Sequence, residues 1–131
     1  MNIAALLLTF AQAFTLTIAV ETLFFLCVGP RGGKFLLLVV LINLFTNILL
    51  NLFLMTTQLT GIIPGRSRLW FYIILALGEA GVLLIEYRAY SAFLARKSKV
   101  LFIKTLLANV LSFSAGIVLG YLLGVQSFQI L

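Results

Sequence analysis

Carboxyl groups inside apolar stretches are the residues of this sequence most able to do chemistry. The chain has three of them, Glu21, Glu79 and Glu86, and each lies within a long apolar run. Amide and ammonium side chains occur in similar surroundings, at Asn43, Asn47, Asn109 and Lys104. A charge at the centre of a bilayer costs at least about 2.5 kcal/mol, so such groups are paired, neutral or functional. Their chemistry would be the binding of protons, a cation or a small polar substrate.

Residue counts exclude several other kinds of site. The sequence contains no His, no Asp and a single Cys, Cys27. The usual zinc and haem ligand sets and a Ser-His-Asp hydrolase are therefore not available. We predict no cofactor. The sequence leaves a metal undecided, because Glu and Asn oxygens by themselves are a conceivable ligand set for Mg²⁺.

The composition indicates a chain embedded in lipid. Of 131 residues, 63% are hydrophobic and 9% are charged, whereas soluble domains carry about 25% charged residues. Both a soluble globular protein and a disordered chain are thereby excluded. In this setting the net charge of +6 indicates loops facing anionic lipid rather than a nucleic-acid partner. The lipid bilayer is the expected partner.

Four segments are long and apolar enough to span a bilayer, which needs about 20 residues each. They cover about residues 3–28, 35–56, 69–93 and 100–125 and together form one domain over 1–131. Breaks between them contain glycine, proline or basic residues, at Gly29–Lys34, Gly61–Arg68 and Ala95–Lys99. The sequence therefore predicts an all-α integral membrane protein, a bundle of four transmembrane helices.

Basic residues are distributed unequally between the two ends of the predicted spans. Two arginines, Arg66 and Arg68, lie in the second loop. The other seven lie in or beside the first and third loops, at Arg31, Lys34, Arg88, Arg96, Lys97, Lys99 and Lys104. The positive-inside rule places the first and third loops in the cytoplasm of a plasma (inner) membrane. Both termini are then on the outer side.

Polar residues of the four spans occur at overlapping depths. Counted from the cytoplasmic end, Glu21 and Glu86 lie about six or seven residues in, and Asn43 and Asn109 about nine, at about 1.5 Å per residue. Deeper still are Asn47 and Glu79, whereas Lys104 lies about four residues in. We predict one polar cluster in the cytoplasmic half, with Lys104 paired to a carboxyl. The spacing of Asn43, Asn47 and Asn51 favours hydrogen bonding between helices over a binding role.

Small residues repeat every fourth position on the last span, at Ser112, Gly116, Gly120 and Gly124. Such a stripe lets helix backbones approach closely, so it predicts helix packing rather than a ligand path. Four helices enclose little space, and this stripe is a candidate seam between two copies of the chain.

Three functions are consistent with these features. The first is a small transporter or channel, a homo-oligomer or one bound to a partner subunit. Its polar cluster would bind protons, a cation or a small polar substrate. The second is an intramembrane enzyme that uses the Glu, Asn and Lys side chains, although no known catalytic motif occurs. The third is a non-catalytic helical subunit of a larger membrane complex.

Overall fold

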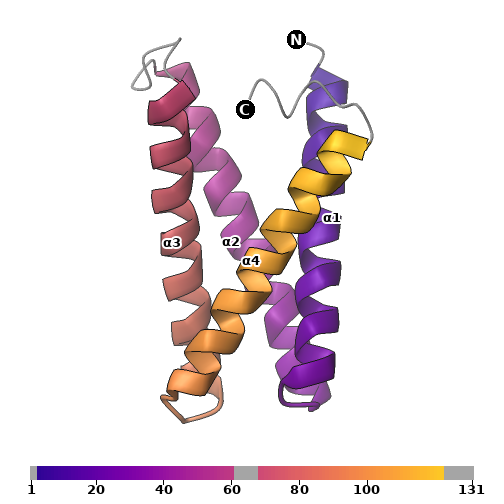
Figure 1. Cartoon of the computed structure of the whole chain (residues 1–131), viewed down its shortest axis with the longest axis vertical. Helices are drawn as coiled ribbons and strands as arrows, with labels where there is room; N and C mark the ends of the chain where they lie inside the picture. Colours follow the sequence, from indigo (N-terminus) through magenta and orange to yellow (C-terminus); the bar gives the residue numbers. More distant parts are fainter. Residues whose placement is uncertain (1–2, 61–67, 123–131) are drawn as a thin grey trace.

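The computed structural model describes residues 3–60 and 68–122, and within them the fold consists of four antiparallel helices (Figure 1). Their bounds are Ile3–Val28 for α1, Gly33–Leu59 for α2, Arg68–Phe93 for α3 and Lys99–Leu122 for α4. Four helices at the predicted places are confirmed, each bound lying within a few residues of its prediction. Residues 123–125, the end of the fourth predicted span, lie outside the described residues.

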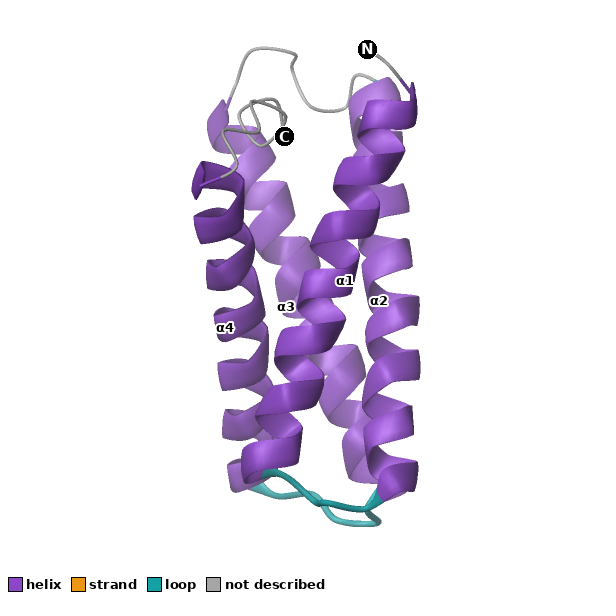
Figure 2. Cartoon of the chain, turned by 90° about the vertical axis from the view of Figure 1, so that its right-hand side faces the viewer, coloured by secondary structure: helices purple, strands orange, loops and turns teal. Residues whose placement is uncertain are grey.

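The α1–α2 and α3–α4 loops are short and lie at the same end of the bundle (Figure 2). In the first loop, the Gly29 amide donates to the Phe25 carbonyl at 2.8 Å and closes the last turn of α1. Pro30 follows at once and has no amide hydrogen to continue that helix.

Helix α3 ends in a Schellman motif. The Ala95 amide donates to the Ala92 carbonyl at 3.2 Å, and the Arg96 amide donates to the Ser91 carbonyl at 3.0 Å. Ala95 adopts a left-handed φ of 48°, a position that glycine usually fills. The motif reverses the chain into α4 within a few residues.

The helices form a ring in which each contacts its two neighbours. The α1–α4 contact is the most extensive of the four and the α3–α4 contact the least. Helix α4 runs obliquely across the bundle, from the foot of α3 toward the upper part of α1 (Figure 1). The two helices α3 and α4 consequently diverge away from the short loops.

Several polar side chains are buried inside the bundle, whereas many large apolar ones are exposed on its outside. Fully or nearly fully buried polar residues come from all four helices: Glu21, Asn43, Thr46, Glu86, Thr105 and Ser112. Large apolar side chains are exposed along the described parts of α1 to α4, as at Leu23, Phe45, Leu84 and Ile117. Gly33–Leu54 of α2 and Lys99–Leu119 of α4 are long and apolar enough to cross a membrane.

An aromatic cluster closes the interior toward the short loops. Tyr90 of α3 is fully buried, and its ring centroid lies 5.2 Å from that of Phe25 and 5.5 Å from that of Phe35. The three rings meet at steep angles, the edge-to-face arrangement that aromatic quadrupoles favour. This cluster fixes the lower ends of α1, α2 and α3 against one another.

Candidate functional site

Glu21 of α1 lies in the middle of the polar interior, with 1% of its surface exposed. Asn43 of α2 donates from Nδ2 to Glu21 Oε2 at 2.9 Å. Ser112 Oγ of α4 lies 3.0 Å from the other carboxyl oxygen, Oε1. Both oxygens of this carboxyl therefore have a neutral partner on a different helix.

Glu86 of α3 has the same kind of surroundings and no exposed surface. Thr46 Oγ1 of α2 lies 3.1 Å from Glu86 Oε1. Asn109 of α4 donates from Nδ2 to Glu86 Oε2. We refer to Glu21, Glu86 and these four partners as the carboxyl pair site, and every helix of the bundle contributes to it.

The two hydroxyl groups of the carboxyl pair site each face a carboxyl oxygen and at least one backbone carbonyl. Thr46 Oγ1 lies 3.0 Å from the Ile42 carbonyl oxygen as well as near Glu86. Ser112 Oγ lies 3.0 Å from the Asn109 carbonyl oxygen as well as near Glu21. A hydroxyl has one hydrogen to donate and can also accept. Each can thus donate to an ionised carboxylate, or donate to the backbone and accept from a protonated carboxyl.

Asn43 links the carboxyl pair site to the aromatic cluster. Its Nδ2 lies 3.5 Å from the Tyr90 hydroxyl and also donates to the Val39 carbonyl at 3.1 Å. Its Oδ1 is buried and has no hydrogen-bond partner among the residues that the structure describes. An acceptor without a donor remains available in the interior.

The other two asparagines of α2 do not reach a carboxyl. Asn47 Nδ2 donates to the Asn43 carbonyl at 2.9 Å, and Asn51 Nδ2 donates to the Asn47 carbonyl at 2.9 Å. Both side chains are half-buried and return to the backbone of their own helix. Asn47, predicted as part of the cluster, is next to the carboxyl pair site but not bonded to its acids.

The predicted pairing of Lys104 with Glu86 or Glu21 is wrong. Lys104 Nζ donates to the carbonyl of Val28, the last residue of α1. That carbonyl has no partner within its helix, and a cation at a helix C-terminus is favoured by the helix dipole. Lys104 therefore caps α1, and the long side chain reaches away from the acids.

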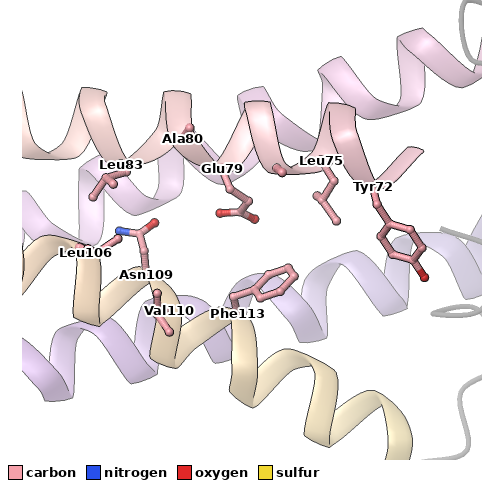
Figure 3. A pocket seen from close by; sticks show the side chains of 10 residues that line it. Tyr72, Leu75, Glu79, Ala80, Leu83, Leu106, Asn109, Val110 and Phe113 are labelled. Atoms are coloured by element: carbon pink, nitrogen blue, oxygen red, sulfur yellow. The ribbon is translucent and has the colours of Figure 1, made fainter. Parts of the chain in front are cut away.

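Glu79 lines a cleft between α3 and α4, with a volume of about 400 Å³. Asn109 lines the same cleft from α4, and both polar side chains extend into the space between the helices (Figure 3). Glu79 is half-buried, and within residues 3–60 and 68–122 no hydrogen bond or ion pair engages its carboxyl. Glu79 thus shares no hydrogen bond with the carboxyl pair site, while Asn109 belongs to both the cleft and that site.

The small-residue stripe of α4 has two different surroundings. Ser112 is buried beside Glu21, whereas a Cβ added to Gly116 would meet nothing within 4 Å. Among the residues that the structure describes, Gly116 therefore has room on its Cβ side for a neighbouring atom. Gly120 lies near the end of α4, and Gly124 lies outside the described residues.

Three members of the interior were not predicted to belong to the binding cluster, although Ser112 was predicted as a helix-packing residue. Thr46 follows Asn43 by three residues, Ser112 follows Asn109 by three, and Tyr90 follows Glu86 by four. Residues three or four apart share a helix face, so the spacing was a usable signal. Hydroxyl-bearing residues are common in apolar helices. The spacing therefore identifies a partner of a carboxyl only where the position of the carboxyl is already known.

Among the residues that the structure describes, no three His, Cys, Asp or Glu side chains gather as a metal site. No family model, curated protein or solved structure shows a significant match to this chain.

Proposed function

We propose that this chain is an integral membrane protein with four transmembrane helices. The apolar outer surface and the polar interior support this, because lipid solvates exposed Leu, Ile and Phe side chains and water does not. We further propose that the α1–α2 and α3–α4 loops face the cytoplasm and both termini lie outside. The excess of Lys and Arg at the end with the short loops supports that orientation.

Within that membrane bundle, we propose a small transporter or channel that binds and releases protons at the carboxyl pair site. One observation carries the proposal: two buried carboxyls, Glu21 and Glu86, have neutral partners at all four oxygens. Within the described part of the chain, no Lys or Arg pairs with either. Two uncompensated carboxylates inside a bundle are costly, so protons or a small cation must offset the charge.

The two hydroxyls make reversible protonation possible without a rearrangement of the helices. Rotation of the Thr46 and Ser112 O–H bonds exchanges a donor for an acceptor at each carboxyl. The heavy atoms keep their positions, 3.1 Å and 3.0 Å apart. A site that accepts and loses protons repeatedly needs partners that can switch between donating and accepting with a small change in free energy. A small cation is the second candidate occupant, because the unpartnered Asn43 Oδ1 offers it another oxygen ligand.

A single four-helix bundle encloses little space, and we propose that the transport path forms in a homo-oligomer. The space beside Gly116, where an added Cβ would meet none of the described residues within 4 Å, supports a contact with a second copy. Native mass measurement after detergent extraction tests this. A second copy supports the proposal, a different subunit favours the scaffold function, and a monomer alone contradicts both.

Proton flux into vesicles tests the function directly. The purified chain is reconstituted with a pH-sensitive dye inside the vesicles, and an imposed pH gradient is followed with and without a sodium gradient. We expect wild-type flux well above empty vesicles and at least a tenfold loss in the Glu21→Gln/Glu86→Gln double variant. Leu84→Gln is the matched control, because Leu84 lies on the same helix as Glu86 but is 56% exposed on the apolar surface.

Three outcomes would contradict the proton proposal. The first is equal flux in the double variant and the wild type, and the second is equal loss in the double variant and Leu84→Gln. The third is an absence of wild-type flux under all gradients. Flux that requires sodium would instead assign the carboxyl pair site to that cation.

A further inference from the structure

The cleft between α3 and α4 has the size and lining of a small-molecule site. Its volume of about 400 Å³ falls within the roughly 300–1,000 Å³ of ligand pockets in proteins. Most of the wall is apolar and comes from both helices, including Leu75, Ala80 and Leu83 of α3 and Leu106, Val110 and Phe113 of α4. The cleft lies where these two helices make the least extensive contact of the ring.

One acidic group stands in this apolar wall. Glu79 extends from α3 into the cleft, and Asn109 extends toward it from α4 (Figure 3). In the parts of the chain that the structure describes, Glu79 has neither a hydrogen bond nor an ion pair. Lys104 of α4 is engaged at the end of α1. The Glu79 carboxylate is therefore available to pair with a cation that enters the cleft.

The lining distinguishes between three kinds of occupant. A lipid acyl chain would fill the apolar wall but leave the Glu79 carboxyl in hydrocarbon without a partner. A bare metal ion needs about six oxygen ligands, and the side chains of Glu79 and Asn109 supply fewer. An organic ammonium ion with apolar substituents satisfies both features, because its charge pairs with Glu79 and its substituents contact the wall.

We propose that the α3–α4 cleft binds one hydrophobic ammonium ion, with the charged nitrogen at Glu79 and the apolar groups against Leu106 and Phe113. This inference rests on the proposed transport function and names its substrate class. Asn109 gives the connection, because it lines the cleft and also donates to Glu86 of the carboxyl pair site.

Equilibrium binding tests the proposal without requiring transport. The full chain is placed in nanodiscs of zwitterionic phosphatidylcholine, and benzyltriethylammonium is titrated by calorimetry. N,N-Diethylbenzamide, a neutral compound of similar shape, is titrated in parallel. We expect saturable binding of the ammonium ion, at least tenfold weaker binding of the amide, and at least tenfold weaker ammonium binding in Glu79→Gln.

Two neighbouring leucines supply a matched pair of variants that leave the charge unchanged. Leu106 lines the cleft, whereas Leu107 is exposed at 47% and is not part of the wall. Leu106→Trp should fill the cleft and reduce ammonium affinity at least tenfold, and Leu107→Trp should bind as the wild type does. This pair keeps the proposal testable if Glu79→Gln fails to fold.

Four results would overturn the inference: no saturable binding, equal binding of the ammonium ion and the amide, wild-type affinity in a folded Glu79→Gln, or equal effects of the two tryptophans. Equal binding of both probes would identify a groove for apolar chains. The Glu21→Gln/Glu86→Gln variant should retain saturable ammonium binding while losing proton flux. Failure of the cleft and failure of the carboxyl pair site are therefore observed separately.

Discussion

Replacing Asn43 by leucine tests whether the buried acids depend on donors from neighbouring helices. Asn43 has no exposed surface, and its Nδ2 donates to Glu21 Oε2 at 2.9 Å across the α1–α2 contact. Leucine has the same branched arrangement of heavy atoms, although its methyl groups are bulkier, and it has no donor, so the change removes the partner of one carboxyl oxygen. The neighbouring Asn47→Leu is the control, because Asn47 Nδ2 donates within its own helix.

The expected loss of unfolding free energy depends on which of two contributions is larger. A hydrogen bond between membrane helices averages about 0.6 kcal/mol, whereas a buried polar atom left without its partner costs about 1–3 kcal/mol. The second term decides the outcome. Loss of the unpartnered Asn43 Oδ1 offsets part of it. We expect Asn43→Leu to lower the free energy of unfolding by about 1–2 kcal/mol and Asn47→Leu by about 0.5 kcal/mol or less.

A double-mutant cycle with Glu21→Leu separates the bond from other effects of the substitution. When both partners of the Glu21–Asn43 bond are apolar, neither side of that bond is left with an unpaired polar atom, and the pair of changes is close to neutral. The cost of Asn43→Leu should therefore fall to about 0.5 kcal/mol or less in the Glu21→Leu background. Reversible unfolding in mixed micelles, with increasing dodecyl sulfate, measures all four free energies.

Two results would refute this reasoning. If Asn43→Leu and Asn47→Leu have equal effects, the cross-helix bond contributes nothing to stability. If the effect of Asn43→Leu is unchanged in the Glu21→Leu background, the cost comes from packing and not from the carboxyl.

Three further predictions concern orientation, capping and packing. In a cysteine-free background, Ser98→Cys should react with impermeant maleimide only from the cytoplasm and Thr60→Cys only from outside; the reverse pattern would invert the proposed orientation. Lys104→Met should lower unfolding free energy by about 0.3–1 kcal/mol, and a loss above about 3 kcal/mol would indicate a broken ion pair with an acid. Gly78→Ala should destabilise by about 1 kcal/mol, because its methyl would overlap a leucine of α2. Gly81→Ala should be tolerated in the same thermal assay, since its Cβ would meet nothing within 4 Å.

The sequence by itself determined the helices and the depth of each polar group along them. Long apolar runs interrupted by glycine, proline and basic residues specify where each helix begins and ends, because backbone groups must be satisfied within each apolar segment. Depth follows from the rise per residue. That argument was enough to predict that Glu21, Asn43, Glu86 and Asn109 share one layer, and the structure brings their side chains together.

Only the tertiary structure decided which groups of that layer meet. Helical spacing gives positions relative to the same helix, whereas contact depends on how each helix is rotated against its neighbours. Asn43 and Asn47 lie four residues apart on one stripe, yet only Asn43 reaches a carboxyl. A small difference in the angular position of the two side chains around the α2 axis determines the hydrogen-bond partner. One side chain reaches an acid of another helix, and the other reaches the backbone of its own helix.

The surroundings of Lys104 and Glu79 also differ from those predicted. Side-chain length accounts for the first difference and helix divergence for the second. Lys104 has a depth suited to an ion pair, but its flexible stem reaches the unpaired carbonyl at the end of α1. Glu79 shares a helix face with Glu86, but it lines the cleft between α3 and α4, two helices that diverge away from the short loops (Figure 1). Neither the reach of a side chain nor the divergence of two helices is encoded in residue spacing, because both arise from packing across the whole bundle.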